Sequence, residues 1–182
     1  MAKLVSKTYG DALFELAVSE GKLDELFAEA KELVTVFSEN QELMKLLGHP
    51  KVVKEEKISV IENIFKGNVS DEMTGFLTLI VKKDRYKNVL EILEYFISEV
   101  KEYKKIGVAT VTTVAAIDDN TKSKIEAKLK ETTQYETFEI CYEVDESLVG
   151  GMIIRIGDKV VDSSIKTKIA ELSKTLYNVQ LS

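Results

Sequence analysis

Cysteine and histidine are almost absent from this sequence of 182 residues, which contains one of each, Cys141 and His49. A single cysteine excludes a disulfide bond within the chain. One cysteine and one histidine also cannot supply the ligands of a Cys/His zinc site. Composition alone therefore removes disulfide-stapled and zinc-stapled folds from consideration.

Positive charge and long apolar runs are scarce as well. Lys and Arg number 25 against 31 Asp and Glu, a net charge of -6. Nucleic acids and anionic membranes bind clustered cations, so neither is an expected partner. The longest near-apolar run, Phe76–Val81, is far too short to span a bilayer. We expect a soluble cytosolic protein with no direct membrane insertion, held at a membrane only through another subunit.

The residues that could carry catalysis are isolated from one another. His49 stands between Gly48 and Pro50, where a loop histidine without a catalytic role is the favoured interpretation. Cys141 lies among glutamates, whose negative charge disfavours a thiolate nucleophile. The sequence has no glycine-rich phosphate loop, so no cofactor is expected. Its carboxylates stand beside lysines at helix starts or on outer helix faces, where helix dipoles and ion pairs explain them, so no metal is expected either. A hydrolase or transferase that uses His49 with nearby acids remains the enzymatic alternative.

The first part of the sequence has the apolar periodicity of amphipathic helices. Ser70 is placed to cap the fifth of these helices and Asp84 to cap the sixth. Short turns between the helices predict a compact antiparallel six-helix bundle over residues 1–105. The helices are expected at 4–20, 22–37, 38–50, 51–67, 71–83 and 85–103.

After Lys105 the periodicity changes, and residues 106–182 predict a small α+β domain. Residues 107–114 and 137–144 alternate and are rich in β-branched or aromatic residues, which is typical of strands. Residues 120–132 and 165–179 return to helical spacing. The expected fold class is α+β, with a β-hairpin and a final helix in the second domain.

The stretch "SLVGGMIIRIGDKVVDSSI", residues 147–165, mixes glycines, aspartates and serines in a way that could line an active site. Each residue type also has a backbone role: glycines permit close approach, a Gly-Asp pair makes a hairpin turn, and Asp or Ser caps a helix. The structural interpretation is therefore favoured, and only the role of Arg155 is left open. The motif residues are Gly150, Gly151, Arg155, Gly157, Asp158, Asp162 and Ser164.

Two of the expected helices are apolar around most of their circumference. Such a helix is either central in its domain or in contact with a second partner. Both helices are core elements, or they border a groove that accepts an amphipathic helix from another protein. The residues concerned are Val5, Tyr9, Ala12, Leu13, Phe14, Leu16, Ala17 and Val18 in the first helix, and Met73, Phe76, Leu77, Leu79, Ile80 and Val81 in the fifth.

Three segments resemble the delta subunits of bacterial F-type ATP synthase, which are homologous to the mitochondrial oligomycin-sensitivity-conferring protein. These segments are "YGDALFELA", "GFLTLIVKKDRYKNVLEIL" and, most specifically, "VGGMIIRIGDKVVDSSIKTKI". Two positions depart from the family pattern. Gly10 stands where alanine is usual, and Ser163 where glycine is frequent.

The resemblance implies a non-catalytic stator subunit that links the catalytic alpha/beta head to the peripheral-stalk b subunits. It implies that a groove between the first and fifth helices binds the N-terminal helix of an alpha subunit. Some of the groove candidates face the bundle core instead, and the sequence alone does not separate them. The candidates are Tyr9, Ala12, Leu13, Leu16, Phe76, Leu79 and Ile80.

The same resemblance implies that the second domain binds the b subunits, with Ile169, Leu172 and Leu176 of the final helix as the candidate contact. It places the protein at the cytoplasmic face of the bacterial cell membrane, held peripherally through the complex. A free-standing helix-binding adaptor is the alternative that also fits an apolar groove.

Overall fold

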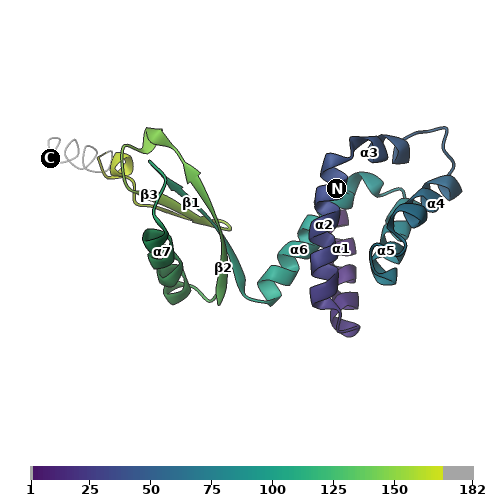
Figure 1. Cartoon of the computed structure of the whole chain (residues 1–182), viewed down its shortest axis with the longest axis horizontal. Coiled ribbons are helices and arrows are strands. Elements are labelled where there is room, and N and C mark those ends of the chain that lie inside the picture. Colours follow the sequence, from purple (N-terminus) through teal and green to yellow (C-terminus); the bar gives the residue numbers. More distant parts are fainter. Residues whose placement is uncertain (1, 170–182) are drawn as a thin grey trace, which may run out of the picture. The chain divides into compact units, whose positions relative to one another are not determined.

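Residues 2–169 are described by the computed structural model, which is a mixed structure of α-helices and one four-stranded sheet (Figure 1). The chain divides into two compact units, with the boundary between Lys101 and Glu102. The first unit is helical and the second contains the sheet. No helix among the described residues is long and apolar enough to cross a membrane.

The first unit packs one face of each helix into a single apolar core. Its elements are α1 (Ala2–Ser19), α2 (Leu23–Glu39), α3 (Gln41–Leu47), α4 (Lys54–Phe65), α5 (Asp71–Lys82), the 3-10 turn η1 (Tyr86–Asn88) and α6 (Val89–Tyr103). Leu13, Leu33 and Phe96 are among its fully or almost fully buried side chains. Because these residues come from three different helices, burial of the core depends on the helices packing together rather than on any helix alone.

The two expected caps have different outcomes. Ser70 caps α5, and its Oγ accepts the amide hydrogen of Met73 at 3.3 Å. The prediction for Asp84 is wrong, because Asp84 has a φ of +57° and ends α5 instead of starting α6. The amides of Asp84 and Arg85 donate to the carbonyls of Val81 and Ile80, a pattern that closes a helix C-terminus.

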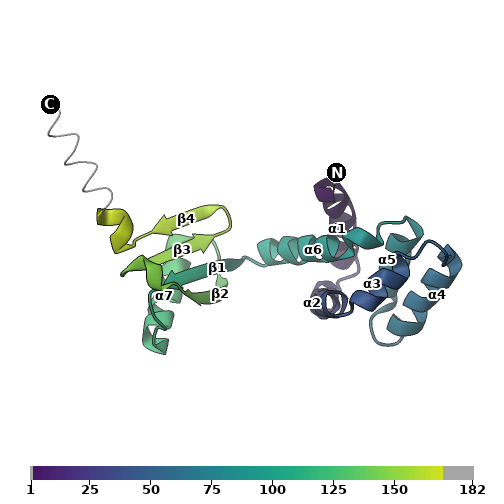
Figure 2. The same ribbon diagram turned by 90° about the horizontal axis from the view of Figure 1, so that it is seen from above.

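The second unit is built around the strand order β2-β1-β3-β4 (Figure 2). Strands β1 and β2 pair in parallel, whereas β3 pairs antiparallel with both β1 and β4. A parallel pair needs a crossover connection, and α7 provides it. The elements are β1 (Ile106–Thr113), α7 (Asp119–Thr132), β2 (Thr137–Val144), the 3-10 turn η2 (Glu146–Leu148), β3 (Met152–Ile156) and β4 (Lys159–Asp162), followed by helical residues at 165–169.

The register of the sheet separates an apolar face from a polar face. Ala109 and Val111 of β1 lie opposite Ile156 and Ile154 of β3 on the apolar face. Ile125 and Leu129 of α7 belong to the same core cluster, so α7 covers this face. The other face carries Glu139, Cys141, Glu143 and Arg155, as the alternation in the sequence predicts.

Candidate interaction surfaces

The two residues considered for catalysis, His49 and Cys141, are both exposed. His49 is exposed after α3, and its Nδ1 accepts the amide hydrogen of Lys51 at 3.2 Å. Cys141 is an exposed free thiol on β2. Within the part of the chain that the structure describes, no group of three or more His, Cys, Asp or Glu could hold a metal ion.

Burial separates the groove candidates of α1 and α5 into two groups. Leu13 and Ile80 are each 1% exposed and Phe76 is 8% exposed, so these three side chains belong to the core. Ala12 and Leu79 are exposed, the latter by 41%. A side chain must be accessible to bind a partner, so the buried group cannot form a contact surface in this conformation.

A half-exposed apolar stripe runs along one side of α1. Val5, Tyr9, Ala12 and Leu16 follow one another at intervals of four, three and four, which places them on one helical face. Val5, Tyr9 and Leu16 also pack against the apolar core of the first unit, and these contacts hold the side chains of the stripe in place. Val5 is not among the predicted site residues, although its helical spacing from Tyr9 could have indicated it.

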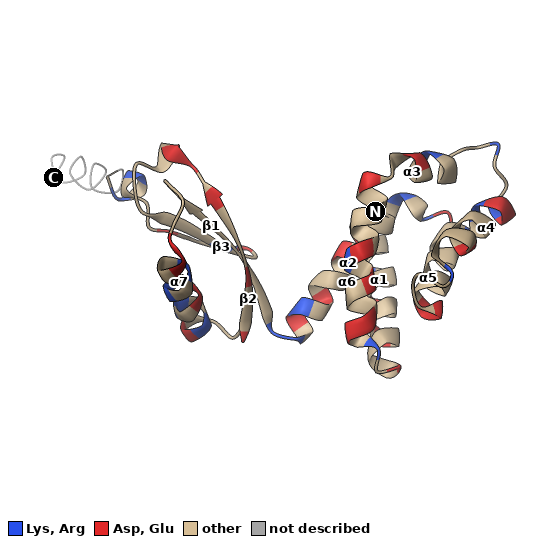
Figure 3. Cartoon of the chain, in the orientation of Figure 1, with Lys and Arg blue, Asp and Glu red and all other residues tan. Residues whose placement is uncertain are grey.

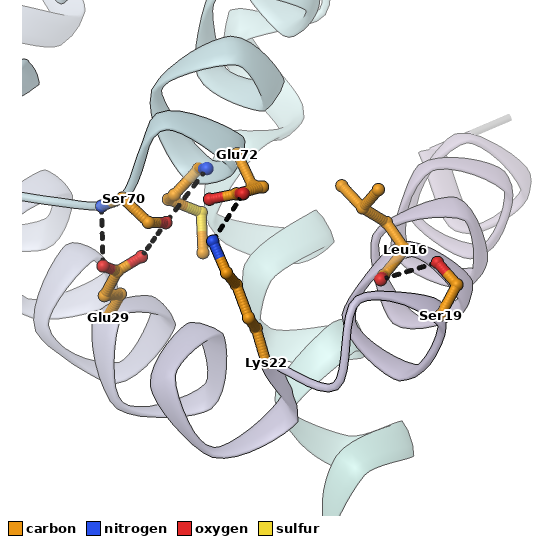
Figure 4. A network of polar contacts seen from close by, with 7 residues as sticks. Leu16, Ser19, Lys22, Glu29, Ser70 and Glu72 are labelled. Atoms are coloured by element: carbon orange, nitrogen blue, oxygen red, sulfur yellow. Dashed lines mark hydrogen bonds and ion pairs between the residues drawn. The ribbon is translucent and has the colours of Figure 1, made fainter.

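Polar contacts connect the beginning of α5 to the α1–α2 region (Figure 4). Lys22 Nζ lies 2.6 Å from Glu72 Oε1. The Glu29 carboxylate accepts the amide hydrogen and the hydroxyl hydrogen of Ser70, each at 2.7 Å. These four residues hold the first turn of α5 against α2 and the turn before it.

The ion pair between Lys22 and Glu72 shifts the pKa of both groups. The hydrogen bond from Lys22 holds the pKa of the Glu72 carboxyl below its ordinary value, and the same bond raises the pKa of Lys22. Glu72 lies in the first turn of α5, where the helix dipole also favours a negative charge. No repeat or spacing in the sequence indicates this pair, because its members are far apart along the chain.

In the second unit, Gly150 and Gly151 lie directly against the segment that leads into the final helix. A Cβ on Gly150 would come within 2.5 Å of Ile165 Cδ1, and one on Gly151 within 2.4 Å of the Ser163 carbonyl oxygen. The Ile165 amide donates to the Gly150 carbonyl at 3.0 Å. This close approach is the reason for two glycines, and it fixes where the final helix begins.

The rest of the motif forms a hairpin and a helix start. Gly157 has a φ of +53° at the first of the two turn residues, Gly157 and Asp158, between β3 and β4. Asp162 Oδ1 accepts the Ser164 amide hydrogen at 2.8 Å, and Ser164 Oγ accepts that of Thr167 at 3.2 Å. Ser164 therefore lies at the N-cap position of the final helix.

The remaining predicted residues of this unit are Arg155 and the apolar residues of the final helix. Arg155 is exposed on the polar face, where it pairs with Thr110 on one side and Val160 on the other. Ile169 is 56% exposed, and Leu172 and Leu176 lie outside the described residues.

An open groove lies over the apolar face of the sheet beside α7, with a volume of about 1140 Å³. The sequence did not predict this groove, although the alternation of side chains in β3 places Met152, Ile154 and Ile156 on the face that lines it. The apolar residues that line it are Ile125, Leu129, Met152, Ile154, Ile156 and Val161.

Comparison with known proteins identifies relatives along nearly the whole chain. The family described as ATP synthase delta (OSCP) subunit matches residues 5–176. The ATP synthase subunit delta of Lachnoclostridium phytofermentans is 55% identical over 181 residues and covers 100% of both chains. The corresponding subunit of Desulforamulus reducens is 34% identical and covers 96% of each. A chain in the cryo-EM structure of the Toxoplasma gondii mitochondrial ATP synthase hexamer has the same fold, with a TM-score of 0.74 and 16% identity over 94% of this chain and 97% of that chain.

Proposed function

The chain belongs to the family of ATP synthase delta (OSCP) subunits, and we propose that it joins the catalytic head of the enzyme to the peripheral stalk through two separate surfaces. It is a structural subunit of the stator and not a catalytic one. Rotation of the central rotor produces useful work only if the head is held still. The protein that holds it needs firm contacts and no reacting groups.

The head contact is assigned to residues 1–105, as a six-helix bundle that receives the N-terminal helix of an alpha subunit. The observation that carries this assignment is the accessibility of apolar side chains on both helices: Ala12 of α1 and Leu79 of α5 are exposed, and Tyr9 and Leu16 on the same face of α1 as Ala12 are half-buried. An amphipathic helix buries its apolar stripe on such a surface. The Glu29–Ser70 and Lys22–Glu72 contacts support the proposal, because they limit movement of α5 relative to α2.

The stalk contact is assigned to residues 106–182, through the final helix and its exposed Ile169. Attachment to the b subunits would hold the protein at the cytoplasmic face of the cell membrane, peripherally and through the complex alone. The absence of a membrane-spanning helix among the described residues is compatible with that arrangement.

The head contact is tested by titrating the intact chain with a synthetic peptide that carries the N-terminal sequence of the cognate alpha subunit. Isothermal calorimetry should show binding to the wild type and a loss of affinity of about tenfold or more for Ala12→Asp, because a charge would then enter an apolar contact. Ala28→Asp, on the exposed side of α2, is the matched control and should bind like the wild type.

Circular dichroism of both variants separates lost contact from lost folding. Absence of binding by the folded wild type, or equal losses in Ala12→Asp and Ala28→Asp, would contradict the assignment of this surface. A free-standing adaptor is distinguished by reconstitution: only a stator subunit restores coupled ATP synthesis to an enzyme that lacks its own delta subunit.

A further inference from the structure

Lys57 is the only charged residue among residues 4–169 that is buried, with 8% of its surface exposed. It lies near the start of α4, and its Nζ is 5.5 Å from the centre of the Tyr86 ring in η1. No carboxylate in the described part of the chain forms an ion pair with this ammonium group. Moving an ammonium group largely out of water without an opposite charge is unfavourable, so the position favours an anion that the chain itself does not supply.

The ammonium end of Lys57 can still be reached from solution. Within the described residues, Nζ is not one of the fully buried polar atoms that lack a hydrogen-bond partner, so the small exposed part of the side chain includes it. The stem of the side chain is already held by burial in the folded protein. An anion that binds Nζ therefore does not have to restrict a long flexible side chain, which is the usual cost of binding by an exposed lysine.

Three segments of the first unit meet at this lysine. Lys54, one turn before Lys57, contacts the carboxylate of Asp84, which follows α5. A Cβ on Gly48, at the end of α3, would come within 3.7 Å of Tyr86 Cε2. The α3–α4 connection, the start of α4 and residues 83–87 are therefore neighbours.

This region has an excess of positive charge, although acids outnumber bases in the chain as a whole. Basic residues mark the α3–α4 connection and the start of α4 (Figure 3). Of the acids, Glu55 and Glu56 are exposed, and Asp84 is already paired with Lys54. The cations of the three segments are Lys51, Lys54, Lys57, Lys83, Arg85 and Lys87.

A phosphate group matches these cations better than a single carboxylate does. It carries about two negative charges near neutral pH and about three acceptor oxygens, so it can bind several cations at once. Lysine binds phosphate as a point charge, and arginine binds it through a planar fork of donors. Lys57 and the exposed Arg85 provide one of each beside Tyr86.

We propose that the α4–η1 site, defined as Lys57, Tyr86 and the cations around them, binds a phosphate group, supplied as inorganic phosphate or as part of a nucleotide. The site shares no residue with the α1–α5 surface to which the alpha-subunit helix is assigned. The inference rests on the buried lysine without a carboxylate partner and on the excess of cations around it. It stands whether or not that helix binds the first unit.

The test records NMR spectra of the intact, isotope-labelled chain during titration with inorganic phosphate, with ADP and, at matched ionic strength, with sodium chloride. Inorganic phosphate or ADP should shift the amide signals of residues 48–57 and 83–87 in a saturable way, with a Kd of about 1 mM or tighter. Binding of ADP that is tighter by about tenfold or more would identify a nucleotide as the source of the phosphate, and any smaller difference would identify free phosphate. No saturable shift, or the same shifts with chloride, would overturn the proposal.

Two lysines of α4 supply matched variants. Lys57→Met keeps an apolar stem and removes the charge, whereas Lys66→Met removes the same charge at the exposed C-cap of the helix. Lys57→Met should weaken phosphate binding about tenfold or more, and Lys66→Met should weaken it less than about twofold. Equal effects of the two variants would show that binding follows net charge alone and would contradict the site.

A third variant and a second measurement keep the test decisive if Lys57→Met folds poorly. Arg85 is exposed, so Arg85→Gln should fold like the wild type and bind phosphate about threefold more weakly or worse. Phosphate should also raise the Tm of the wild type and of Lys66→Met, but not that of Lys57→Met. Unchanged binding by Arg85→Gln, or an equal rise of Tm in all these proteins, would assign the effect of phosphate to general salt stabilisation and overturn the proposal.

Discussion

The ring of Tyr95 in α6 lies directly against the backbone of Gly10 in α1. A Cβ on Gly10 would come within 2.4 Å of Tyr95 Cδ1, and the Tyr95 hydroxyl donates to Asp11 Oδ1 at 2.9 Å. Burial raises the pKa of Tyr95, and hydrogen bonds with Asp11 and Glu99 raise it further. Gly10, at a position where the family resemblance implies alanine, therefore leaves the space that the Tyr95 ring occupies.

Gly10→Ala should destabilise the chain despite the better helix propensity of alanine. Alanine gains about 1 kcal/mol in a helix interior, but displacing the Tyr95 ring costs about 1–3 kcal/mol. In a Tyr95→Ala background the clash is gone, and Gly10→Ala should then stabilise by up to about 1 kcal/mol. Urea unfolding of the four proteins in this cycle measures the change of sign. A stabilising Gly10→Ala in the wild type would contradict the packing described here.

Gly151→Ala should cost more than Gly157→Ala. Both glycines have positive φ, +81° and +53°, so alanine is strained at either position by about 1–2 kcal/mol. Only at Gly151 would the added Cβ also meet a carbonyl, that of Ser163. Thermal unfolding should therefore rank Gly151→Ala as the less stable variant, with faster hydrogen exchange at Ser163 and Ile165. Equal stabilities would show that the segment after β4 moves aside at no cost.

Asp162 should stabilise the start of the final helix in a pH-dependent way. Hydrogen bonds from Thr167 and then from Ser164 lower its pKa below the ordinary 3.8. A lowered folded pKa means that the ionised carboxylate stabilises the fold above pH 3.8, and that this contribution is lost as pH falls through the lowered pKa. Asp162→Ala should melt earlier than the wild type at pH 7, and the gap should shrink below pH 3.8. A gap that is constant over this range would contradict the role of the charge.

Glu29 and Ser70 should show coupled effects on the stability of the first unit. Ser70→Ala removes the cap of α5, which costs about 1 kcal/mol, and also removes the hydroxyl that donates to Glu29 Oε2, while the backbone amide of residue 70 still donates to Oε1. A double-mutant cycle with Glu29→Ala should give a coupling energy of about 0.5–2 kcal/mol by urea unfolding. Ser59→Ala is the control, because its hydroxyl bonds only to the Glu55 carbonyl in the same helix. Additive effects would show that Glu29 does not act through Ser70.

Local patterns were sufficient to predict most of the secondary structure. Alternation over 137–144 predicted β2, and helical spacing predicted α7, because side-chain direction follows directly from the backbone period. Asp84 shows where a local pattern is ambiguous. An aspartate can cap a following helix or adopt positive φ at the end of the preceding one, and the contacts of the Asp84 and Arg85 amides decide for the second.

The candidate surfaces required more than pattern. Ala12 and Leu13 are adjacent in sequence and both apolar, yet one is exposed and the other is 1% exposed. Neighbours on a helix point about 100° apart, so which of them is buried depends on where α6 and α5 pack. The same holds for Tyr95 and Gly10, whose contact joins residues far apart along the chain.

The sequence by itself determined the elements, the polar and apolar faces of the sheet, and the absence of a disulfide or zinc framework, because each of these follows from residue type and spacing. Only the tertiary structure decided which apolar side chains remain accessible. It alone showed that, among the described residues, Ile154, Ile156 and Val161 line an open groove beside α7. Those outcomes depend on how distant segments pack, and no local period encodes the position of a neighbouring helix.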